Sequence, residues 1–214
     1  MNREIMDFVQ ARGITEVVHF TTNHGLLGVF ASQAVLSRDQ LNADQYLENI
    51  RKVNCASRKD PEWTDYVNMS ISVANKRMLT TSQGWHGVED VWWAVLSFSA
   101  EVLADEGVWF TTTNNTYATT VRRGQGLAGL QDLYSEPIPW GYYGAESWRR
   151  GLPDHRPTND QAEVLYPRSV PIGKLRAIYV PKEEHLEDIE GWVAAIPSVP
   201  HVPVMCRPEV FLNG

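Results

Sequence analysis

The chain has 214 residues, of which 43% are hydrophobic and 21% charged, proportions close to those of an average globular protein. This composition excludes a disordered chain, a collagen-like repeat and a coiled coil. A formal net charge of −7 provides no overall positive field for duplex DNA or an anionic membrane, although 19 Lys and Arg leave room for a local basic groove. The two cysteines, Cys55 and Cys206, lie far apart, so neither a disulfide framework nor a zinc module is expected.

The N-terminal sequence lacks the long apolar core of a signal peptide, and no apolar run approaches the length of a membrane span. We therefore expect a cytoplasmic protein that does not contact a membrane. The chain contains neither an internal repeat nor a low-complexity linker, so residues 1–214 are expected to form a single domain.

The first elements follow from hydrophobic spacing. Residues 1–13 have apolar side chains at helical intervals and Gly13 at the end, which predicts a short amphipathic helix. Residues 14–21 are rich in β-branched side chains and predict a strand. Apolar residues recur at helical spacing over 25–41, which predicts a second helix.

The remainder of the chain is dominated by strand patterns. Alternation over 63–74 predicts a strand with Tyr66, Asn68, Ser70 and Ser72 on one face. Helices are predicted at 126–134 and 182–195, and residues 137–158, rich in Gly, Pro, Trp and Arg, are expected to form a long irregular loop. Further strands are predicted at 91–99, 108–120, 162–167, 175–181 and 202–212. Because strands concentrate in the second half without regular βαβ alternation, the fold class is α+β rather than a doubly wound sheet.

Aromatic residues divide into two groups. Trp92, Trp93 and Trp109 lie in strand-like runs, where they are expected to fill the core. A second group falls in the predicted loop, beside arginines and with few apolar neighbours; it comprises Trp140, Tyr142, Tyr143 and Trp148. Such residues can stack on nucleobases, or they can simply pack within the loop.

Two polar positions could carry chemistry. His19 ends a β-branched run and has no second histidine at a metal-ligand spacing, so a structural role is the ordinary one and no metal is expected. Glu163 follows a polar stretch at the start of a strand, on the same face as Gln161. An acid there is usually solvated, but one that faces a cleft can act as a catalyst.

A basic segment precedes the strand at 63–74. It contains Arg51, Lys52, Arg58 and Lys59, which form either a solvated face or a diphosphate site. Neither GxxxxGK[ST] nor a GxGxxG after a strand is present, and there is no GxSxG serine motif.

Several segments together resemble the DarT family of DNA ADP-ribosyltransferase toxins, over nearly the whole chain. The resemblance rests on VVHFTTNHGLLGVFASQAVLS (17–37), DYVNMSIS (65–72), VWFTTTNN (108–115), and QAEVLYP with LRAIYVP (161–181). The details HFTTN, SQGWH, TTTNN and PTNDQAEVLYP are most similar to the branch that modifies guanine in single-stranded DNA, whereas the better-known branch modifies thymine. An asparagine of the thymine branch is replaced here by Gly25, with Asn23 nearby.

The resemblance implies an ADP-ribosyltransferase fold, with two packed, bent sheets and NAD+ bound between them as co-substrate. His19, Thr21 and Asn23 would hold the adenosine side, and Tyr66, Asn68 and Ser70 would border the nicotinamide pocket. Glu163 would be the catalytic glutamate at the end of a substrate-recognition loop over 137–162, with Arg58 or alternatively Arg51 as its arginine partner.

The resemblance also implies a substrate and partners. The acceptor would be a base of single-stranded DNA, with guanine favoured, and the partner an antitoxin that removes ADP-ribose by glycohydrolase activity. Backbone contacts would come from Arg122, Arg123, Arg149 and Arg150. Two alternatives stay open: the same fold acting on thymine, RNA or protein, and a non-catalytic module that binds single-stranded nucleic acid.

Overall fold

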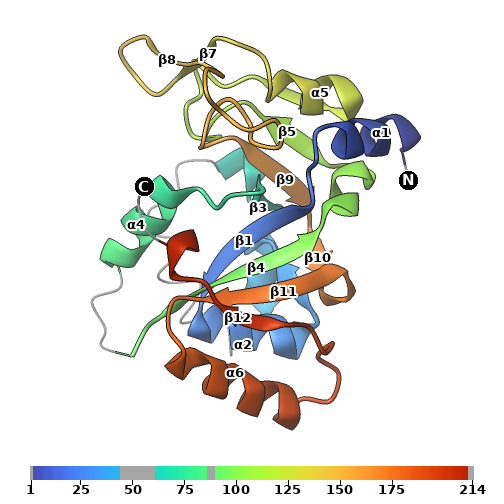
Figure 1. The fold of residues 1–214 in the computed structure, drawn as a ribbon, viewed down its shortest axis with the longest axis vertical. Helices are drawn as coiled ribbons and strands as arrows, with labels where there is room; N and C mark the ends of the chain where they lie inside the picture. The colour runs from blue at the N-terminus through green and yellow to red at the C-terminus, as the bar shows by residue number, and fades with distance from the viewer. Residues whose placement is uncertain (1, 44–60, 86–89, 212–214) are drawn as a thin grey trace.

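The computed structural model describes residues 2–43, 61–85 and 90–211. Within these residues, eight strands form one sheet in the order β12-β11-β4-β1-β3-β9-β5-β6 (Figure 1). Every neighbouring pair is antiparallel except β11 and β12, which are parallel. The predicted α+β class is confirmed. The two sheets that the family resemblance implies are joined here, because β1 pairs with β3 at their shared edge.

The bounds of the strands and helices are as follows. The strands of the large sheet are β1 (Glu16–Thr22), β3 (Tyr66–Ile71), β4 (Trp93–Ser99), β5 (Trp109–Thr111), β6 (Arg123–Gln125), β9 (Glu163–Pro167), β11 (Leu175–Val180) and β12 (Val204–Cys206). Two small sheets pair β2 (Ala34–Leu36) with β10 (Ser169–Pro171), and β7 (Ile138–Trp140) with β8 (Ala145–Ser147). The α-helices are α1 (Arg3–Ala11), α2 (Asn23–Ser32), α4 (Lys76–Trp85), α5 (Gly126–Asp132) and α6 (Glu184–Ala195). Short 3-10 helices occupy Arg38–Ala43, Pro61–Trp63, Ala100–Ala104, Ile172–Lys174 and Pro208–Val210.

The N-terminal helix forms as the sequence predicts. The side-chain oxygen of Asn2 accepts hydrogen bonds from the backbone N–H groups of Glu4 and Ile5, which caps α1. Gly13 has a φ of +66°, a left-handed conformation that glycine adopts without strain, and the chain turns there into β1.

The predicted helix over 25–41 is wrong in its second half. The helix α2 ends at Ser32, and Gln33 then adopts a left-handed φ of 59°. Val35 is buried in β2, which pairs with β10, so its apolar side chain serves a strand instead of a helix face. Tertiary pairing therefore overrides a spacing that was compatible with a helix.

Three other predicted elements also need correction. The strand over 108–120 is formed only as β5, and the polar residues after Thr111 leave the sheet. The loop over 137–158 is not wholly irregular, since it contains the β7–β8 hairpin. The predicted strand over 202–212 is confined to β12, after which a 3-10 helix begins at Pro208.

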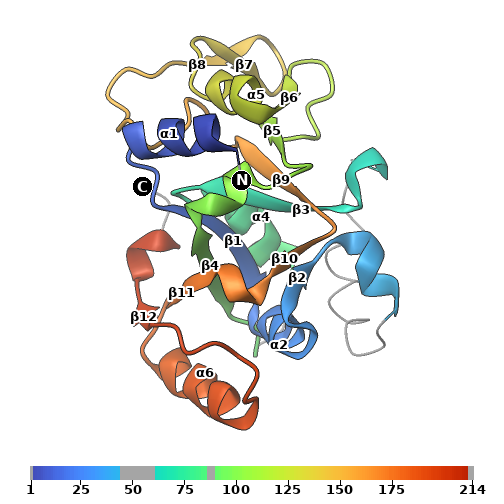
Figure 2. The same cartoon turned by 90° about the vertical axis from the view of Figure 1, so that its right-hand side faces the viewer.

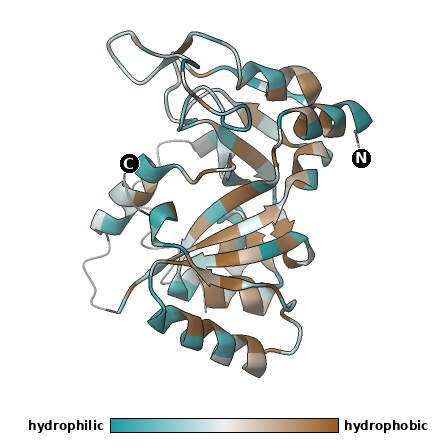
Figure 3. Cartoon of the chain, viewed as in Figure 1, coloured by the Kyte–Doolittle hydropathy of each residue, from teal (hydrophilic) through white to brown (hydrophobic). Residues whose placement is uncertain are grey.

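Apolar side chains fill both faces of the central strands. The larger core cluster packs α1, α2, α5 and α6 against the sheet, whereas the smaller one lies between the sheet and α4, around Val18, Leu79 and Trp93. In Figure 3 the central strands are mostly brown, and the outer face of α6 carries teal positions. Trp93 and Trp92 pack on these clusters as predicted, and Trp109 packs edge-on against Trp63.

Candidate active site

A split between β1 and β3 creates the centre of the site. The register of the two strands pairs Val17 with Ile71 and Val18 with Ser70, whereas β4 pairs with β1 along its whole length. Beyond Val18 the backbone ladder with β3 is replaced by a side chain: Nδ1 of His19 lies 2.8 Å from the carbonyl oxygen of Asn68. This bond accounts for the orientation of His19 and brings two predicted cofactor residues together.

Glu163 begins β9, on the opposite side of β3 from His19. Met69 pairs with Val164, so the antiparallel register continues with Ser70 beside Glu163. Ser70 in turn pairs with Val18, the neighbour of His19. Glu163 and His19 therefore lie two strands apart, a separation of about 10 Å. The sequence-predicted catalytic acid and cofactor residues are thus grouped across three adjacent strands.

The carboxylate of Glu163 is enclosed and oriented. Only 8% of the residue is exposed, and its Oε2 accepts a 2.8 Å hydrogen bond from the backbone N–H of Asn115. Charge-assisted hydrogen bonds of this kind stabilise an ionised carboxylate and fix its direction. Glu163 is thus a buried acid held by a backbone donor, and not a solvated one.

Asn115 is itself held by Arg123. Nε of Arg123 donates to the side-chain oxygen of Asn115 at 2.6 Å, and Nη2 donates to its carbonyl oxygen at 2.9 Å. The guanidinium group also lies over the ring of Trp63, 5.5 Å from its centroid. The turn that presents an N–H to Glu163 is therefore clamped on both its side chain and its backbone.

Sequence reasoning missed this clamp, because it placed Asn115 only within the VWFTTTNN motif and assigned Arg123 to a DNA contact. The available signal was the polar run Thr111-Thr112-Thr113-Asn114-Asn115 following a short strand. Four of its members are almost completely buried, namely Thr111, Thr112, Thr113 and Asn115. Buried polar residues at the end of a strand are rare unless they form a hydrogen-bond network, which is what the run provides.

Thr21 and Gly25 are packed against each other at the start of α2. Thr21 is buried, and Thr22 caps the helix by accepting a hydrogen bond from the N–H of Gly25 at 3.1 Å. A Cβ atom built on Gly25 would overlap Oγ1 of Thr21. The substitution that distinguishes this chain from the thymine branch is therefore tied to the local packing of a predicted cofactor residue.

We expect Gly25→Asn to lower the free energy of unfolding by about 1–3 kcal/mol, since the added side chain must displace Thr21. The affinity for NAD+ should fall with it if Thr21 contacts the co-substrate. Thermal unfolding and titration calorimetry with NAD+ would measure the two effects. Gly173→Asn is a suitable control, since no atom lies within 4 Å of a Cβ at that position; an equal loss there would contradict the packing explanation.

The remaining predicted cofactor residues lie on β3 and at the start of α2. Asn68 and Ser70 occupy β3, and Tyr66 begins that strand with its ring 5.2 Å from the ring of Trp63. Asn23 begins α2, and its Nδ2 donates to the carbonyl oxygen of Asp90 at 2.9 Å. Its Oδ1 is buried and makes no hydrogen bond.

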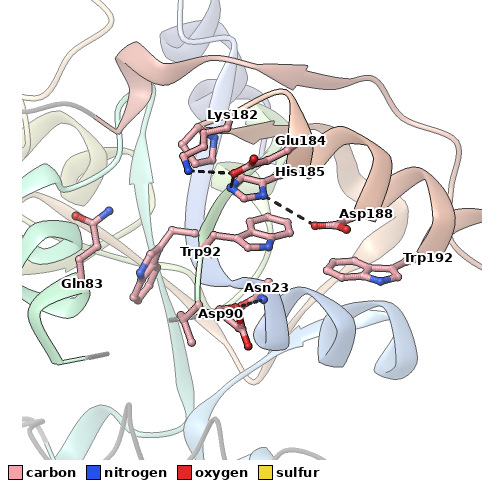
Figure 4. A pocket seen from close by; sticks show the side chains of 12 residues that line it. Asn23, Gln83, Asp90, Trp92, Lys182, Glu184, His185, Asp188 and Trp192 are labelled. Atoms are coloured by element: carbon pink, nitrogen blue, oxygen red, sulfur yellow. Dashed lines mark hydrogen bonds and ion pairs between the residues drawn. The ribbon is translucent and has the colours of Figure 1, made fainter. Parts of the chain in front are cut away.

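Asn23 faces a cavity of about 760 Å³, lined also by residues of β4 and α6 (Figure 4). Trp92 stacks on His185 at 4.2 Å and on Trp192 at 5.8 Å, which gives the cavity an aromatic wall. Burial lowers the pKa of His185 below its usual value, and Glu184 opposes this shift. The imidazole is therefore neutral at neutral pH and suited to stacking.

The two candidate catalytic arginines, Arg51 and Arg58, lie outside the described residues. Their role as partners of Glu163 stays a prediction.

The aromatic candidates for DNA contact lie on and beside the β7–β8 hairpin. Tyr142 is 64% exposed, Trp148 is 57% exposed and Tyr143 is fully exposed. Trp140 is half-buried, with the guanidinium of Arg77 5.6 Å from its ring centroid. These exposed rings are available for stacking, although Tyr142 also packs edge-on against Tyr117 at 5.4 Å, so a DNA contact stays a prediction.

Three of the four arginines proposed for the DNA backbone have their donors directed into the protein. Arg122 forms two 2.8 Å bonds with Asp132, Arg123 clamps Asn115, and Arg149 donates to the carbonyl oxygens of Arg156 and Pro153. Within the part of the chain that the structure describes, exposed Arg150 makes no ion pair. The structure thus corrects the expectation that all four guanidinium groups are available to DNA.

Two expected absences can be examined over residues 2–43, 61–85 and 90–211. No group of three or more His, Cys, Asp or Glu side chains there is placed to hold a metal ion. None of the helices in those ranges combines the length and apolar composition needed to cross a bilayer.

Comparison with known proteins identifies the family. The family model described as "ssDNA thymidine ADP-ribosyltransferase, DarT" matches residues 18–212. Among curated protein sequences, no significant match is found.

Solved structures share the fold. The structure of Thermus sp. 2.9 DarT in complex with NAD+ is similar, with a TM-score of 0.65 and 20% identity over 92% of this chain and 98% of that chain. The same protein in complex with ADP-ribosylated ssDNA gives a TM-score of 0.65 and 20% identity over 94% and 97% of the two chains. Thermosipho africanus DarTG in complex with ADP-ribose gives a TM-score of 0.59 and 15% identity over 92% of this chain and 51% of that chain. The match to the family model extends over nearly the whole chain and includes both Glu163 and His19, so this chain belongs to the DarT family of single-stranded DNA ADP-ribosyltransferases.

Proposed function

We propose that this enzyme transfers ADP-ribose from NAD+ to a guanine base of single-stranded DNA. The observation that supports this most directly is the buried, oriented carboxylate of Glu163, two strands from His19 in a family of ADP-ribosyltransferases. The similar Thermus sp. 2.9 structures contain NAD+ and ADP-ribosylated ssDNA.

The chain offers polar atoms that fit NAD+ as a co-substrate. Oδ1 of Asn23 and Nδ2 of Asn115 are buried and make no hydrogen bond. Buried polar atoms without partners are costly, and a bound molecule rich in hydroxyl and amide groups would supply the missing partners. Asn115 would form a hydrogen bond to the ribose near Glu163, and Asn23 would form one to the adenosine side of NAD+. His19 and Thr21 would fix the same side, while Tyr66, Asn68 and Ser70 border the nicotinamide.

The reaction exchanges one glycosidic bond for another. The bond between nicotinamide and the ribose carbon breaks, nicotinamide leaves as a neutral molecule, and a nitrogen of the base forms a new bond to that carbon. The ribose develops positive charge in the transition state. The carboxylate of Glu163 stabilises this charge while it accepts a hydrogen bond from the ribose 2′-hydroxyl. Glu163 then takes the proton that the base nitrogen loses, and releases it to solvent.

The proposed substrate is consistent with the acidic chain. A base in a duplex is stacked and paired, whereas a single strand presents its bases without that cost. The exposed rings of Tyr142, Tyr143 and Trp148 can hold such a strand by stacking, at roughly 1–3 kcal/mol per base. A net charge of −7 is then compatible with DNA binding.

We further propose that the protein is the toxin of a toxin–antitoxin pair in the cytoplasm. DNA that carries ADP-ribose blocks templated copying, so a cell that makes this enzyme needs a partner that removes the group. An antitoxin with glycohydrolase activity would do so, and the structural likeness to Thermosipho africanus DarTG, solved with ADP-ribose, supports this context. The proposal also takes residues 1–214 to be a single domain.

Mass spectrometry of oligonucleotides tests the proposal. Single strands that each lack one base would be incubated with NAD+ and the enzyme, beside matched RNA and protein acceptors. A gain of one ADP-ribose that requires guanine supports the proposal, and one that requires thymine, the base of the thymidine that the family is named for, overturns the choice of base. Modification of RNA or protein alone overturns the choice of acceptor, and strand binding without NAD+ consumption favours a binding module.

A further inference from the structure

A small cavity lies beside the catalytic residues and is lined by an unsatisfied amide. Its volume is about 150 Å³, and Gln161, two residues before Glu163, forms part of its wall. Pockets for drug-sized ligands start at roughly 300 Å³, so this one fits a single planar base and excludes a whole nucleotide. Half-buried Trp140 lines the same space and can stack on such a base.

Asn75 supplies the unsatisfied group. The residue is 3% exposed, and its Oδ1 accepts a 3.0 Å hydrogen bond from the N–H of Met78, which caps α4. This bond fixes the orientation of the amide, so Nδ2 is the remaining donor. Nδ2 is buried and makes no hydrogen bond to any residue that the structure describes, although Asn75 lines the cavity. A buried donor without a partner indicates that a ligand provides an acceptor.

Gln161 adds a second donor to the wall. Its Oε1 accepts from the hydroxyl of Tyr117 at 3.4 Å, which leaves Nε2 free to donate within the described residues. The other amide in the wall, Asn159, is fully used: Oδ1 accepts from Thr113 and from the N–H of Gln161, and Nδ2 donates to Ser147. The buried amides of Asn75 and Gln161 therefore present donors, while the exposed carboxylate of Asp160 adds an acceptor to the same wall. Guanine fits this combination, because its O6 and N7 are both acceptors and its ring and exocyclic N–H groups are donors.

The cavity adjoins a larger one whose wall carries four cations and also three carboxylates, those of Glu16, Asp160 and Glu209. This larger cavity, of about 840 Å³, shares Lys76, Arg77 and Arg156 with the smaller one and extends toward Arg207, on the side where α4 meets the C-terminal segment (Figure 1). Arg77 is exposed, and the side chains of Arg77 and Arg156 form no ion pair within the described residues. Arg207 is paired with Glu209 at 2.8 Å, and Nζ of Lys76 donates to the carbonyl oxygen of Glu209 at 3.3 Å, so Arg77 and Arg156 are the cations most available to a phosphate.

We propose that the cavity formed by Asn75, Trp140 and Gln161 is the pocket that recognises a guanine of the DNA strand, and that Arg77 and Arg156 hold the phosphates beside it. This inference rests on the proposed function and deepens it. Asn75 sets the identity of the base, whereas the cations set affinity without regard to sequence. The four arginines considered from the sequence are not part of this path.

The matched test is Asn75→Asp. Aspartate keeps the oxygen that caps α4, but it replaces the Nδ2 donor by an acceptor. We expect kcat/KM for guanine-containing strands to fall roughly a hundredfold. For strands in which the guanine is replaced by a base with an amino group on its recognised edge, kcat/KM should rise relative to the value for guanine. Asn75→Ser keeps a capping oxygen and removes the amide, so it should cost roughly tenfold without the gain.

Asn2→Asp is the control, because Asn2 also caps a helix through its side-chain oxygen and lines neither of these two cavities. It should leave base preference and kcat/KM unchanged, and all three variants should melt near the wild-type temperature. An unchanged preference in Asn75→Asp overturns the inference. So does an equal loss for every base, because that result would assign Asn75 to helix capping alone.

A binding measurement separates this inference from the proposed function. Fluorescence anisotropy with single-stranded oligonucleotides should show that Arg77→Ala weakens binding equally for all sequences and reduces the slope of affinity against salt. If Arg77→Ala keeps the wild-type affinity and the wild-type slope of affinity against salt, the proposal that these cations hold the DNA phosphates is contradicted. If the wild-type enzyme modifies DNA and the Asn75 variants behave normally, only the pocket is refuted; if it modifies no DNA, both proposals fail.

Discussion

Replacement of Glu163 by Gln should lower the rate of ADP-ribose transfer by a thousandfold or more while the protein remains folded. The amide is nearly the same size as the carboxylate, and its oxygen can still accept the N–H of Asn115. It carries no charge to stabilise the developing positive charge on the ribose, an effect worth about 10²- to 10³-fold. It also cannot take the proton from the base, which adds a comparable factor.

The measurement is the rate of ADP-ribosylated oligonucleotide formation under single-turnover conditions, together with NAD+ affinity from calorimetry. NAD+ should bind Glu163→Gln almost as well as wild type, because the lost interactions belong to the transition state. Glu190→Gln is a control, since Glu190 is exposed on α6 and away from the cleft. A variant that retains more than a tenth of the wild-type rate would remove Glu163 from the chemistry.

The position of Glu163 at the start of a strand could be predicted from the sequence, because the residues around it follow a clear pattern. Val164, Leu165 and Tyr166 form a buried apolar strand after a polar loop, and this pattern predicts both β9 and an acid at its start. The strands that pair with β9 could not be predicted from the sequence. Which residues face Glu163 depends on register with β3 and β5, and register is a property of distant segments brought together.

The helix over 25–41 illustrates the opposite case. Its first half is correct because Thr22 provides a cap and the apolar residues face the sheet. Its second half fails because three residues, Ala34–Leu36, pair with Ser169–Pro171 from a segment more than 130 residues away. Periodicity describes a face but cannot report such a partner.

Arginines were the least predictable site residues. Charge beside aromatic residues indicated DNA contacts for Arg122, Arg123 and Arg149, yet each is used to hold the protein together. A guanidinium group has five donors, and a nearby carbonyl or carboxylate satisfies them as well as a phosphate does. Only the fold decides between these partners. Likewise, the Asn75 cavity combines α4, the β7–β8 hairpin and the loop before β9, which no local pattern unites.

Arg122 and Arg123 provide a matched pair for testing the clamp on Asn115. The two arginines are neighbours in the sequence. Arg122 binds Asp132 at the surface, whereas Arg123 holds the turn whose backbone N–H group donates to Glu163. We expect Arg123→Ala to lower kcat by about 10- to 100-fold, because small displacements of a catalytic group have effects of this size. KM for NAD+ should change less than kcat, since Asn115 would contribute one hydrogen bond to the ribose, whereas the orientation of the Glu163 carboxylate sets the rate of transfer.

Stability should separate the two variants as well. Arg123→Ala leaves Oδ1 of Asn115 buried without its donor, at a cost of about 1–3 kcal/mol in the free energy of unfolding. Arg122→Ala removes an ion pair whose side chains are 41% and 36% exposed, so its cost should stay below about 1 kcal/mol. Chemical denaturation measures both, and kinetics should be compared at a temperature where each variant is fully folded.

A purely structural role for Arg123 would give a different kinetic pattern. If Arg123 only stabilised the fold, kcat per folded molecule would remain at the wild-type value once unfolding is accounted for. If it contacted the DNA backbone, as its basic neighbourhood suggested, KM for DNA would rise, the salt dependence would weaken and kcat would be retained. Arg123→Lys can supply one of the two hydrogen bonds and should recover part of kcat. A selective loss of kcat with partial recovery by lysine is expected only if Arg123 positions Glu163 through Asn115.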